Sequence, residues 1–200
     1  MASASCCECD VQASLEHHPV ILHDDTLDRT TSGVGPVCRP LSELASLRLR
    51  DSHGRLTDEP LPTLAAVLEI MPAGKWLLIE LKSGDDAMLA EVASLTAGRR
   101  CRFQSFDIKT LRALRRRVEP DRLAVLVEDA AALQAAIRDD WPAVNMLHSL
   151  LNEATAAELA AAGKSIGVWT VNSPADIRRS VALGAEWIIT DDPLGAGAVL

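Results

Sequence analysis

From Lys75 onward the chain repeats one pattern, a short continuous apolar run followed by a helix signal, and this pattern constrains the fold most strongly. Continuous apolar strands that alternate with helices are typical of a parallel sheet covered on both faces. Right-handed strand–helix–strand connections then leave two architectures, a doubly wound sheet or a barrel. The expected strands are 76–81, 101–106, 123–127, 144–147, 165–171 and 187–190, and the helices between them are 85–95, 108–117, 130–138, 153–162 and 174–184.

Polar residues at the ends of the strands decide between the two architectures. A (β/α)₈ barrel collects its chemistry from the carboxyl ends of many strands. A dinucleotide-binding sheet would need a G-x-G-x-x-G turn after a strand, and the sequence has none. The pattern therefore favours the barrel, and the strand-closing polar residues are Glu8, Asp10, Glu80, Lys82, Gln104, Ser105, Glu128, His148, Thr170, Asn172, Asp191 and Asp192.

The number of expected barrel strands is smaller than the eight of a complete barrel. One strand from the N-terminal region plus the six later runs makes seven barrel strands, and 200 residues lie at the lower end of the barrel range of ~200 to more than 400. The chain finishes with a strand and a helix start at Asp192-Pro193. We therefore expect a barrel that lacks its first strand–helix unit, at the N-terminal side.

The stretch from Cys6 to Gly33 carries a candidate site. Glu8 and Asp10 are two residues apart in an apolar run, so on a strand both carboxylates point to one face. A tight turn near residues 15–16 would bring the next run, 19–22, back antiparallel and deliver His23 opposite Glu8. Two carboxylates and an imidazole would then converge on one patch.

A long polar segment, 24–62, separates this hairpin from the next strong helix signal at Pro62-Thr63. It contains one short helix candidate, 41–47, started by Pro40. A connection of this length is unusual, so we expect an inserted lobe beside the site. The interpretation is one domain over 1–200 that includes this lobe.

Composition limits the partners. The chain is 48% hydrophobic with a net charge of −8, which argues against nucleic acid as a partner. No apolar run reaches the ~18 residues of a transmembrane segment, and the first five residues lack the features of a signal peptide. Five cysteines, an odd number, fit a reducing cytoplasm, and we interpret Cys6, Cys7 and Cys9 as apolar fillers of a buried strand.

Several ordered motifs resemble the glycerophosphodiester phosphodiesterase family. The resemblance spans nearly the whole chain, and its strength lies in the order of the motifs, since each one alone is weak. The motifs are Glu8-Cys9-Asp10-Val11, Val20 to Thr31 (VILHDDTLDRTT), Pro62-Thr63-Leu64, Ile79-Glu80-Leu81-Lys82, Gln104-Ser105-Phe106-Asp107, Val168 to Asn172 (VWTVN), and Ile188 to Pro193 (IITDDP).

The resemblance implies a barrel hydrolase of lipid and glycerol metabolism, related in fold to phospholipase C, that splits glycerophosphodiesters into glycerol 3-phosphate and an alcohol. Glu8, Asp10 and Glu80 match three carboxylates that hold one divalent cation, Mg²⁺ or Ca²⁺, which prefer oxygen ligands. The remaining roles implied are a catalytic histidine for His23, a phosphate contact for Lys82 and a pocket wall for Trp169.

The sequence also differs from this family in one respect. The family begins with a His-Arg-Gly strand and a Pro-Glu-Asn-Thr segment, and neither is present in these 200 residues. We therefore expect impaired turnover. Two alternatives remain: a non-catalytic metal- or phosphodiester-binding remnant, which could self-associate through the incomplete barrel, and a phosphoinositide phospholipase C-like enzyme, which the motifs fit less well.

Overall fold

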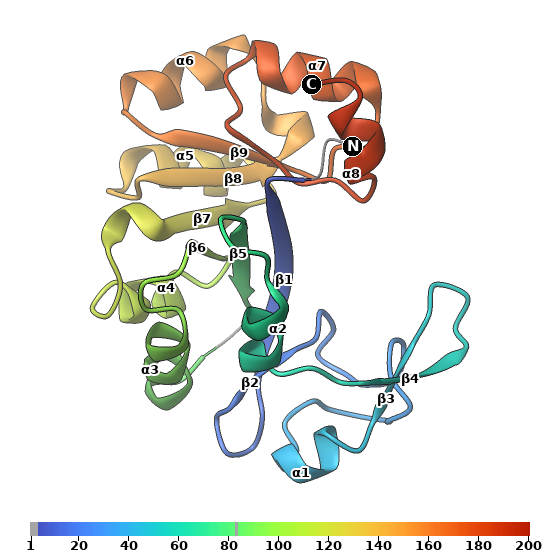
Figure 1. The fold of residues 1–200 in the computed structure, drawn as a ribbon. Helices are drawn as coiled ribbons and strands as arrows, with labels where there is room; N and C mark the ends of the chain where they lie inside the picture. Colours follow the sequence, from blue (N-terminus) through green and yellow to red (C-terminus); the bar gives the residue numbers. More distant parts are fainter. Residues whose placement is uncertain (1–3, 83) are drawn as a thin grey trace.

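The computed structural model describes residues 4–82 and 84–200, and its centre is a curled eight-stranded sheet (Figure 1). The strands follow the order β10-β9-β8-β7-β6-β5-β1-β2. All neighbours are parallel except β2 (Pro19–Ile21), which pairs antiparallel with the end of β1. The seven parallel strands are β1 Cys6–Ala13, β5 Trp76–Leu81, β6 Cys101–Ser105, β7 Leu123–Val127, β8 Ala143–Leu147, β9 Ser165–Trp169 and β10 Trp187–Ile188.

The expected alternation of strands and helices from residue 75 onward is confirmed. Side chains cap the helices where the sequence predicts: Asp107 accepts from the Lys109 amide and Asn152 from the Thr155 amide. The helices are α2 Leu64–Ile70, α3 Asp86–Leu95, α4 Ile108–Leu114, α5 Ala130–Arg138, α6 Glu153–Ala161, α7 Pro174–Ala182 and α8 Pro193–Gly197, with short 3₁₀ turns η1 Pro120–Arg122 and η2 His148–Leu150.

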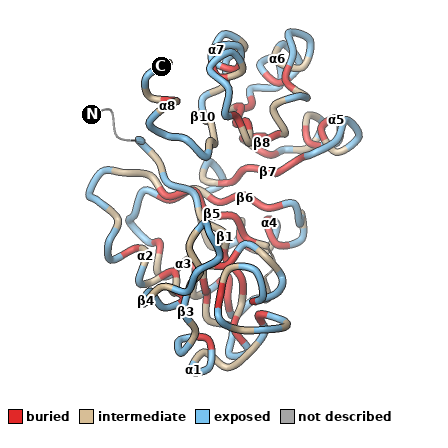
Figure 2. The backbone as a smooth tube through the Cα atoms, turned by 90° about the vertical axis from the view of Figure 1, so that its right-hand side faces the viewer, coloured by how far each residue is buried: buried red, intermediate tan, exposed pale blue. Residues whose placement is uncertain are grey.

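The main hydrophobic core lies between the parallel strands and these helices. Figure 2 shows the buried segments concentrated along β5 to β8, and the helices that connect these strands, α3, α4 and α5, also contain buried residues. Every residue of β7 is buried, and Phe103 of β6 is fully buried. Continuous burial is the physical reason why these strands appear in the sequence as uninterrupted apolar runs.

Residues 24–62 project from the end of β2 and carry a second, smaller core (Figure 1). The expected helix 41–47 ends earlier, as α1 (Leu41–Leu44). The segment also contains two strands that the sequence did not predict, β3 (Arg48–Arg50) and β4 (Leu56–Pro60), which pair antiparallel. The buried side chains of this second core are Leu27, Val37, Leu44 and Leu61, together with Val20 of β2 and Leu22 just after it. The division into one domain with an inserted lobe stays a prediction.

The ring of strands is open between β1 and β10, which no ladder joins in the described part of the chain. An apolar cavity of about 330 Å³ lies at this opening, lined among others by Cys6, Ile188 and Leu200. The expectation that the N-terminal cysteines fill a buried strand is wrong: Cys7 is exposed, and Cys6 and Cys9 are only half-buried. The cause is that β1 borders the opening.

Candidate active site at the carboxyl ends of the strands

A polar cavity of about 370 Å³ lies at the carboxyl ends of the strands. It includes all six residues that the sequence singled out, and they come from β1, β5 and β9 and from the residues just after β2 and β5. The lining residues are Glu8, Asp10, His23, Glu80, Lys82, Gln104, Phe106, Leu126, Trp169, Thr170, Ile189 and Asp191.

Three carboxylates converge in this cavity. Asp10 and Glu80 are direct neighbours across the parallel β1–β5 pair, and Glu8 lies two residues before Asp10 on the same face. One oxygen from each of the three lies within 4.8 Å of the others. The periodicity of β1 and the register with β5 therefore bring together the three residues that the sequence proposed as a group.

Neighbouring carboxylates contribute to the pKa shifts of Glu8 and Glu80. The pKa of Glu8 is raised to about 8, because burial removes water from the carboxyl and because Asp10 and Glu80 add negative charge beside it. Burial also raises the pKa of Glu80, although Lys82 opposes this shift. Such mutual repulsion is expected where several carboxylates share a site that a cation can neutralise.

Lys82 supplies positive charge to the cluster. Its Nζ lies 2.9 Å from Asp10 Oδ1 and 2.5 Å from Glu80 Oε1. Burial lowers the pKa of the ammonium, but the hydrogen bonds to Glu80 and Asp10 outweigh this effect and raise it overall. Lys82 therefore remains protonated in the cavity.

Two side-chain amides, those of Gln104 and Asn145, form a hydrogen-bonded chain that orients Glu8. Gln104 of β6 donates from Nε2 to Glu8 Oε1 at 3.3 Å and accepts at 2.7 Å from Asn145 Nδ2 of β8. Asn145 lies against Gly167 of β9, where a Cβ would overlap its side chain. Only glycine at this position leaves room for the amide, so Gly167 maintains the order of the carboxylate site.

His23 is held by an acidic neighbour. Its Nδ1 lies 2.8 Å from Asp24 Oδ1, and Arg29 donates two hydrogen bonds to the same carboxylate, at 2.6 and 2.7 Å. These hydrogen bonds hold the pKa of Asp24 well below its usual range. The ionised carboxylate favours a proton on Nδ1, and this leaves Nε2 as the basic nitrogen of His23.

An aromatic pair forms part of the cavity wall. Trp169 donates from Nε1 to the Asn145 carbonyl at 3.2 Å, which fixes the indole ring. Phe106 meets it edge to face, with ring centroids 5.7 Å apart. Trp169 therefore lies in the cavity, as the sequence expected, and Phe106 adds a second ring.

With this geometry in view, similarity to known proteins identifies the family. The profile of the "Glycerophosphoryl diester phosphodiesterase family" matches residues 1–194. The chain belongs to this family.

Individual relatives agree with the family match. A glycerophosphodiester phosphodiesterase of Caldanaerobacter subterraneus subsp. tengcongensis is 30% identical over 205 residues, which cover 93% of this chain and 82% of that protein.

Solved structures of the family share the fold. A glycerophosphodiester phosphodiesterase of Agrobacterium tumefaciens superposes with a TM-score of 0.79 at 24% identity, covering 98% of this chain and 87% of that one. A phosphodiesterase of Oleispira antarctica, solved with the product sn-glycerol-3-phosphate, superposes with a TM-score of 0.78 at 22% identity over 96% of this chain and 83% of that one. The α/β barrel architecture expected from the strand pattern is thereby confirmed.

Sequence reasoning missed several residues in and around this cavity. Asp24 and Arg29 lie inside a motif that was noticed, but nothing in the motif indicates that they hold the His23 ring. Asn145 stands in mid-strand, where an apolar residue is the norm, and an isolated amide in such a strand was the available signal. Phe106 was noticed only as a letter of a motif.

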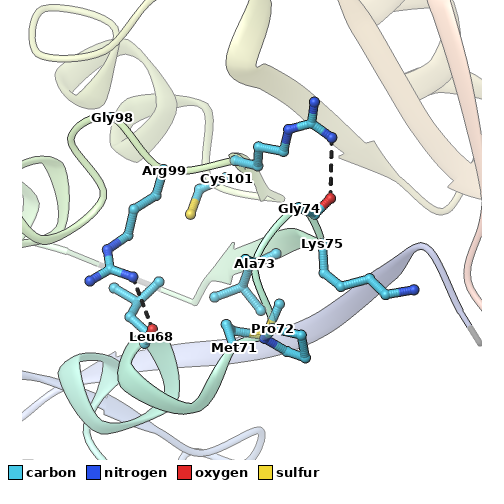
Figure 3. A pocket seen from close by; sticks show the side chains of 11 residues that line it. Leu68, Met71, Pro72, Ala73, Gly74, Lys75, Gly98, Arg99 and Cys101 are labelled. Carbon is cyan, nitrogen blue, oxygen red and sulfur yellow. Dashed lines mark hydrogen bonds between the residues drawn. The ribbon is translucent and has the colours of Figure 1, made fainter.

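A second cavity, of about 250 Å³, lies at the opposite ends of β5 and β6 (Figure 3). Arg99 and Arg100 are among the residues that line it. Arg99 donates to the Leu68 carbonyl at 2.9 Å and Arg100 to the Gly74 carbonyl at 3.1 Å. The two guanidinium groups thus brace different connections around the cavity and do not converge on a common ligand.

No helix in the described ranges, 4–82 and 84–200, is long and apolar enough to span a bilayer.

Proposed function

We propose that the cavity hydrolyses glycerophosphodiesters to glycerol 3-phosphate and an alcohol in a metal-dependent reaction. The observation that carries the proposal is the convergence of Glu8, Asp10 and Glu80 beside Lys82, in the same cavity as His23. A phosphodiester anion needs positive charge around it, and a general acid or base beside it.

The donor set fits a hard divalent cation. All three groups are carboxylates, and their oxygens lie close enough together to share one ion. Burial, and after it the negative charges of Asp10 and Glu80, raise the pKa of Glu8, and a bound cation would favour its ionised form. We propose Mg²⁺ or Ca²⁺ as the ion, held by Glu8, Asp10 and Glu80, and when bound it supplies charge neutralisation to the phosphodiester.

The other residues have distinct roles in this proposal. Lys82 contacts the phosphate as a point charge. His23 transfers a proton through Nε2, because its Nδ1 is engaged by Asp24. Trp169 packs against the organic part of the substrate, with its ring fixed by the bond to Asn145.

We further propose that these 200 residues turn over slowly on their own. The sequence holds no His-Arg-Gly segment, so the acid–base partner that the family resemblance implies for His23 is absent from it. Loss of one acid–base group typically lowers the rate by ~10²–10⁴-fold.

Turnover of glycerophosphocholine by the chain, with Mg²⁺ or Ca²⁺ and with a chelator, tests these proposals. We expect metal-dependent release of glycerol 3-phosphate at a rate ~10²–10⁴-fold below that of a full-length relative, and loss of this release in Glu80→Gln. A rate equal to that of the relative contradicts the impairment, and equal rates with and without metal contradict the metal dependence.

The competing proposal is a non-catalytic module that binds metal or phosphodiester. The opening between β1 and β10 favours it, because unpaired strand edges and the apolar cavity there promote association with a second chain. Light scattering tests the self-association that this competing proposal includes. A metal-bound monomer argues against it. Nothing in the site favours a phosphoinositide phospholipase C-like activity, and the cytoplasmic location stays a prediction.

A further inference from the structure

Phe106 is an exposed aromatic residue for which the proposed chemistry has no use. Its surface is 44% exposed, in the loop between β6 and α4, at the mouth of the cavity. An aromatic ring that lines a cavity and keeps part of its surface exposed is available to contact a ligand. Phe106 and Trp169 stand at 89° to each other, so two ring surfaces of different orientation border the same space.

A carboxylate lines the same cavity from a distant part of the chain. Asp191 follows β10, and its Oδ2 accepts a hydrogen bond of 2.8 Å from Asn172 Nδ2. The same Asn172 accepts from the Asp191 amide at 2.9 Å and from Thr190 Oγ1 at 3.1 Å. Three hydrogen bonds around one amide therefore fix a negative charge at the mouth.

The balance of charge in the cavity favours a cation as ligand. Among the described residues that line it, Lys82 is the one lysine or arginine, and both Asp10 and Glu80 already pair with it. Asp191 has no such cationic neighbour among the lining residues. Aromatic faces attract ammonium groups, and a nearby carboxylate strengthens that attraction.

We propose that Phe106, Trp169 and Asp191 bind the alcohol portion of the substrate and select alcohols that carry an ammonium group, such as choline. This inference rests on the proposed function, since it assumes that the phosphate lies at the carboxylate cluster. The two rings and Asp191 line the same cavity as the carboxylate cluster, so they are available to the alcohol of a phosphodiester bound there. Neutral polyols such as glycerol or inositol gain neither interaction.

Equilibrium binding tests the proposal independently of turnover. Calorimetric titration with glycerophosphocholine and with glycerophosphoglycerol, both in the presence of Ca²⁺, compares a cationic with a neutral alcohol on the same phosphate. We expect the choline ester to bind at least about 5-fold more tightly, since one exposed cation–π contact is worth about 2- to 5-fold. The ratio should shrink as ionic strength rises.

Two conservative variants isolate the interactions. Phe106→Leu keeps an apolar side chain and removes the ring, and Asp191→Asn removes the charge while its amide oxygen can still accept from Asn172. Each should lower the ratio of the two affinities, choline ester over glycerophosphoglycerol, about 2- to 5-fold. Asp121→Asn, in η1 at the opposite ends of the strands, is the matched control and should leave the preference intact.

The outcomes separate this inference from the proposed function. Equal affinity for the two esters overturns the ammonium selectivity and leaves the phosphodiesterase proposal standing. A preference that survives in both variants also overturns the assignment to Phe106 and Asp191. If neither ester binds with Ca²⁺ present, the phosphate site itself is wrong and both proposals fall.

Discussion

The N-terminal part of the chain, 4–62, and the strand–helix part that follows contribute to one site by different means. The N-terminal part supplies Glu8, Asp10 and His23 from a hairpin that leads into a small second core. The later part supplies Glu80, Lys82 and Trp169 from strands within the main core. Half of the six candidate residues therefore come from a hairpin that borders the opening of the sheet, and half from strands whose buried side chains form most of the main core.

The largest effect is expected from the main core. Phe103→Ala removes a fully buried ring and should lower the free energy of unfolding by about 3–5 kcal/mol. Leu44→Ala, in the small core, should cost nearer ~2 kcal/mol, at the low end for such truncations, because fewer neighbours surround it. Urea unfolding measures both, and hydrogen exchange should show the Leu44 variant opening only residues 24–62.

The exposed Leu56→Ala is the control for these truncations and should change stability by less than about 0.5 kcal/mol. Global unfolding of the Leu44 variant in a single step would show that the two cores are not energetically distinct.

The second-largest effect is expected from the removal of Glu80, the one carboxylate that the strand–helix part adds to the cluster. Glu80→Gln should weaken Mg²⁺ or Ca²⁺ binding at least ~100-fold, since even outer ligand partners are worth 10–100-fold. Calorimetric titration measures it, with the exposed Glu59→Gln as the control. Unchanged affinity would mean that β1 alone holds the ion.

Gly167→Ala tests how the later strands order a residue of β1. The added Cβ should displace Asn145, and the overpacking should cost about 1–3 kcal/mol of stability. Through Gln104 the displacement reaches Glu8, so metal affinity should fall at least ~10-fold. Ser165→Ala, in the same strand, should leave metal affinity unchanged, and an equal loss in both variants would refute the amide chain.

The pH dependence of stability tests the coupling between the two parts. Glu8 has a pKa of about 8 in the folded chain, above its ordinary value of 4.5, so the folded state binds more protons than the unfolded state between these pH values. Stability of the metal-free chain should therefore fall as pH rises from about 4.5 to about 8. Thermal unfolding measures the slope, which should diminish in Glu8→Gln.

The smallest effect is expected at an exposed ion pair of the N-terminal part. Arg29→Ala removes two hydrogen bonds to Asp24, but the arginine side chain is 64% exposed. Water screens such pairs, so stability should fall only slightly. Urea unfolding checks this, and a loss as large as that of Leu44→Ala would show that the pair anchors residues 24–62.

The strands and helices from residue 75 onward could be predicted because each carries its own local signal. An apolar run, a capping residue such as Asp107 or Asn152, and a helix follow one another within a few residues. The position of Glu8 and Asp10 on one strand face was predictable for the same reason, because their two-residue spacing is local. Glu80 joined this group only through the family resemblance, because the register of β1 with β5 pairs residues far apart in the sequence.

The other features of the fold and of the candidate site could not be predicted, because they depend on contacts between residues far apart in the sequence. Strands β3 and β4 were missed because polar side chains dominate them, and Thr31 bridges to Leu49 only after the segment has folded back. The link from Asn145 through Gln104 to Glu8 spans three strands, and no spacing in the sequence indicates it. Asp24 and Arg29 are close in sequence, but charge alone does not show which ring they hold.

Lys82 gives the carboxylate cluster a built-in counterion. Because its ammonium already lies between Asp10 and Glu80, part of the negative charge that β1 and β5 bring together is balanced within the chain. A cation bound by the three carboxylates, as proposed, would compete with this tethered ammonium, and the released Lys82 would then be free to contact the phosphate. Binding of the metal and release of Lys82 would in that case be one event.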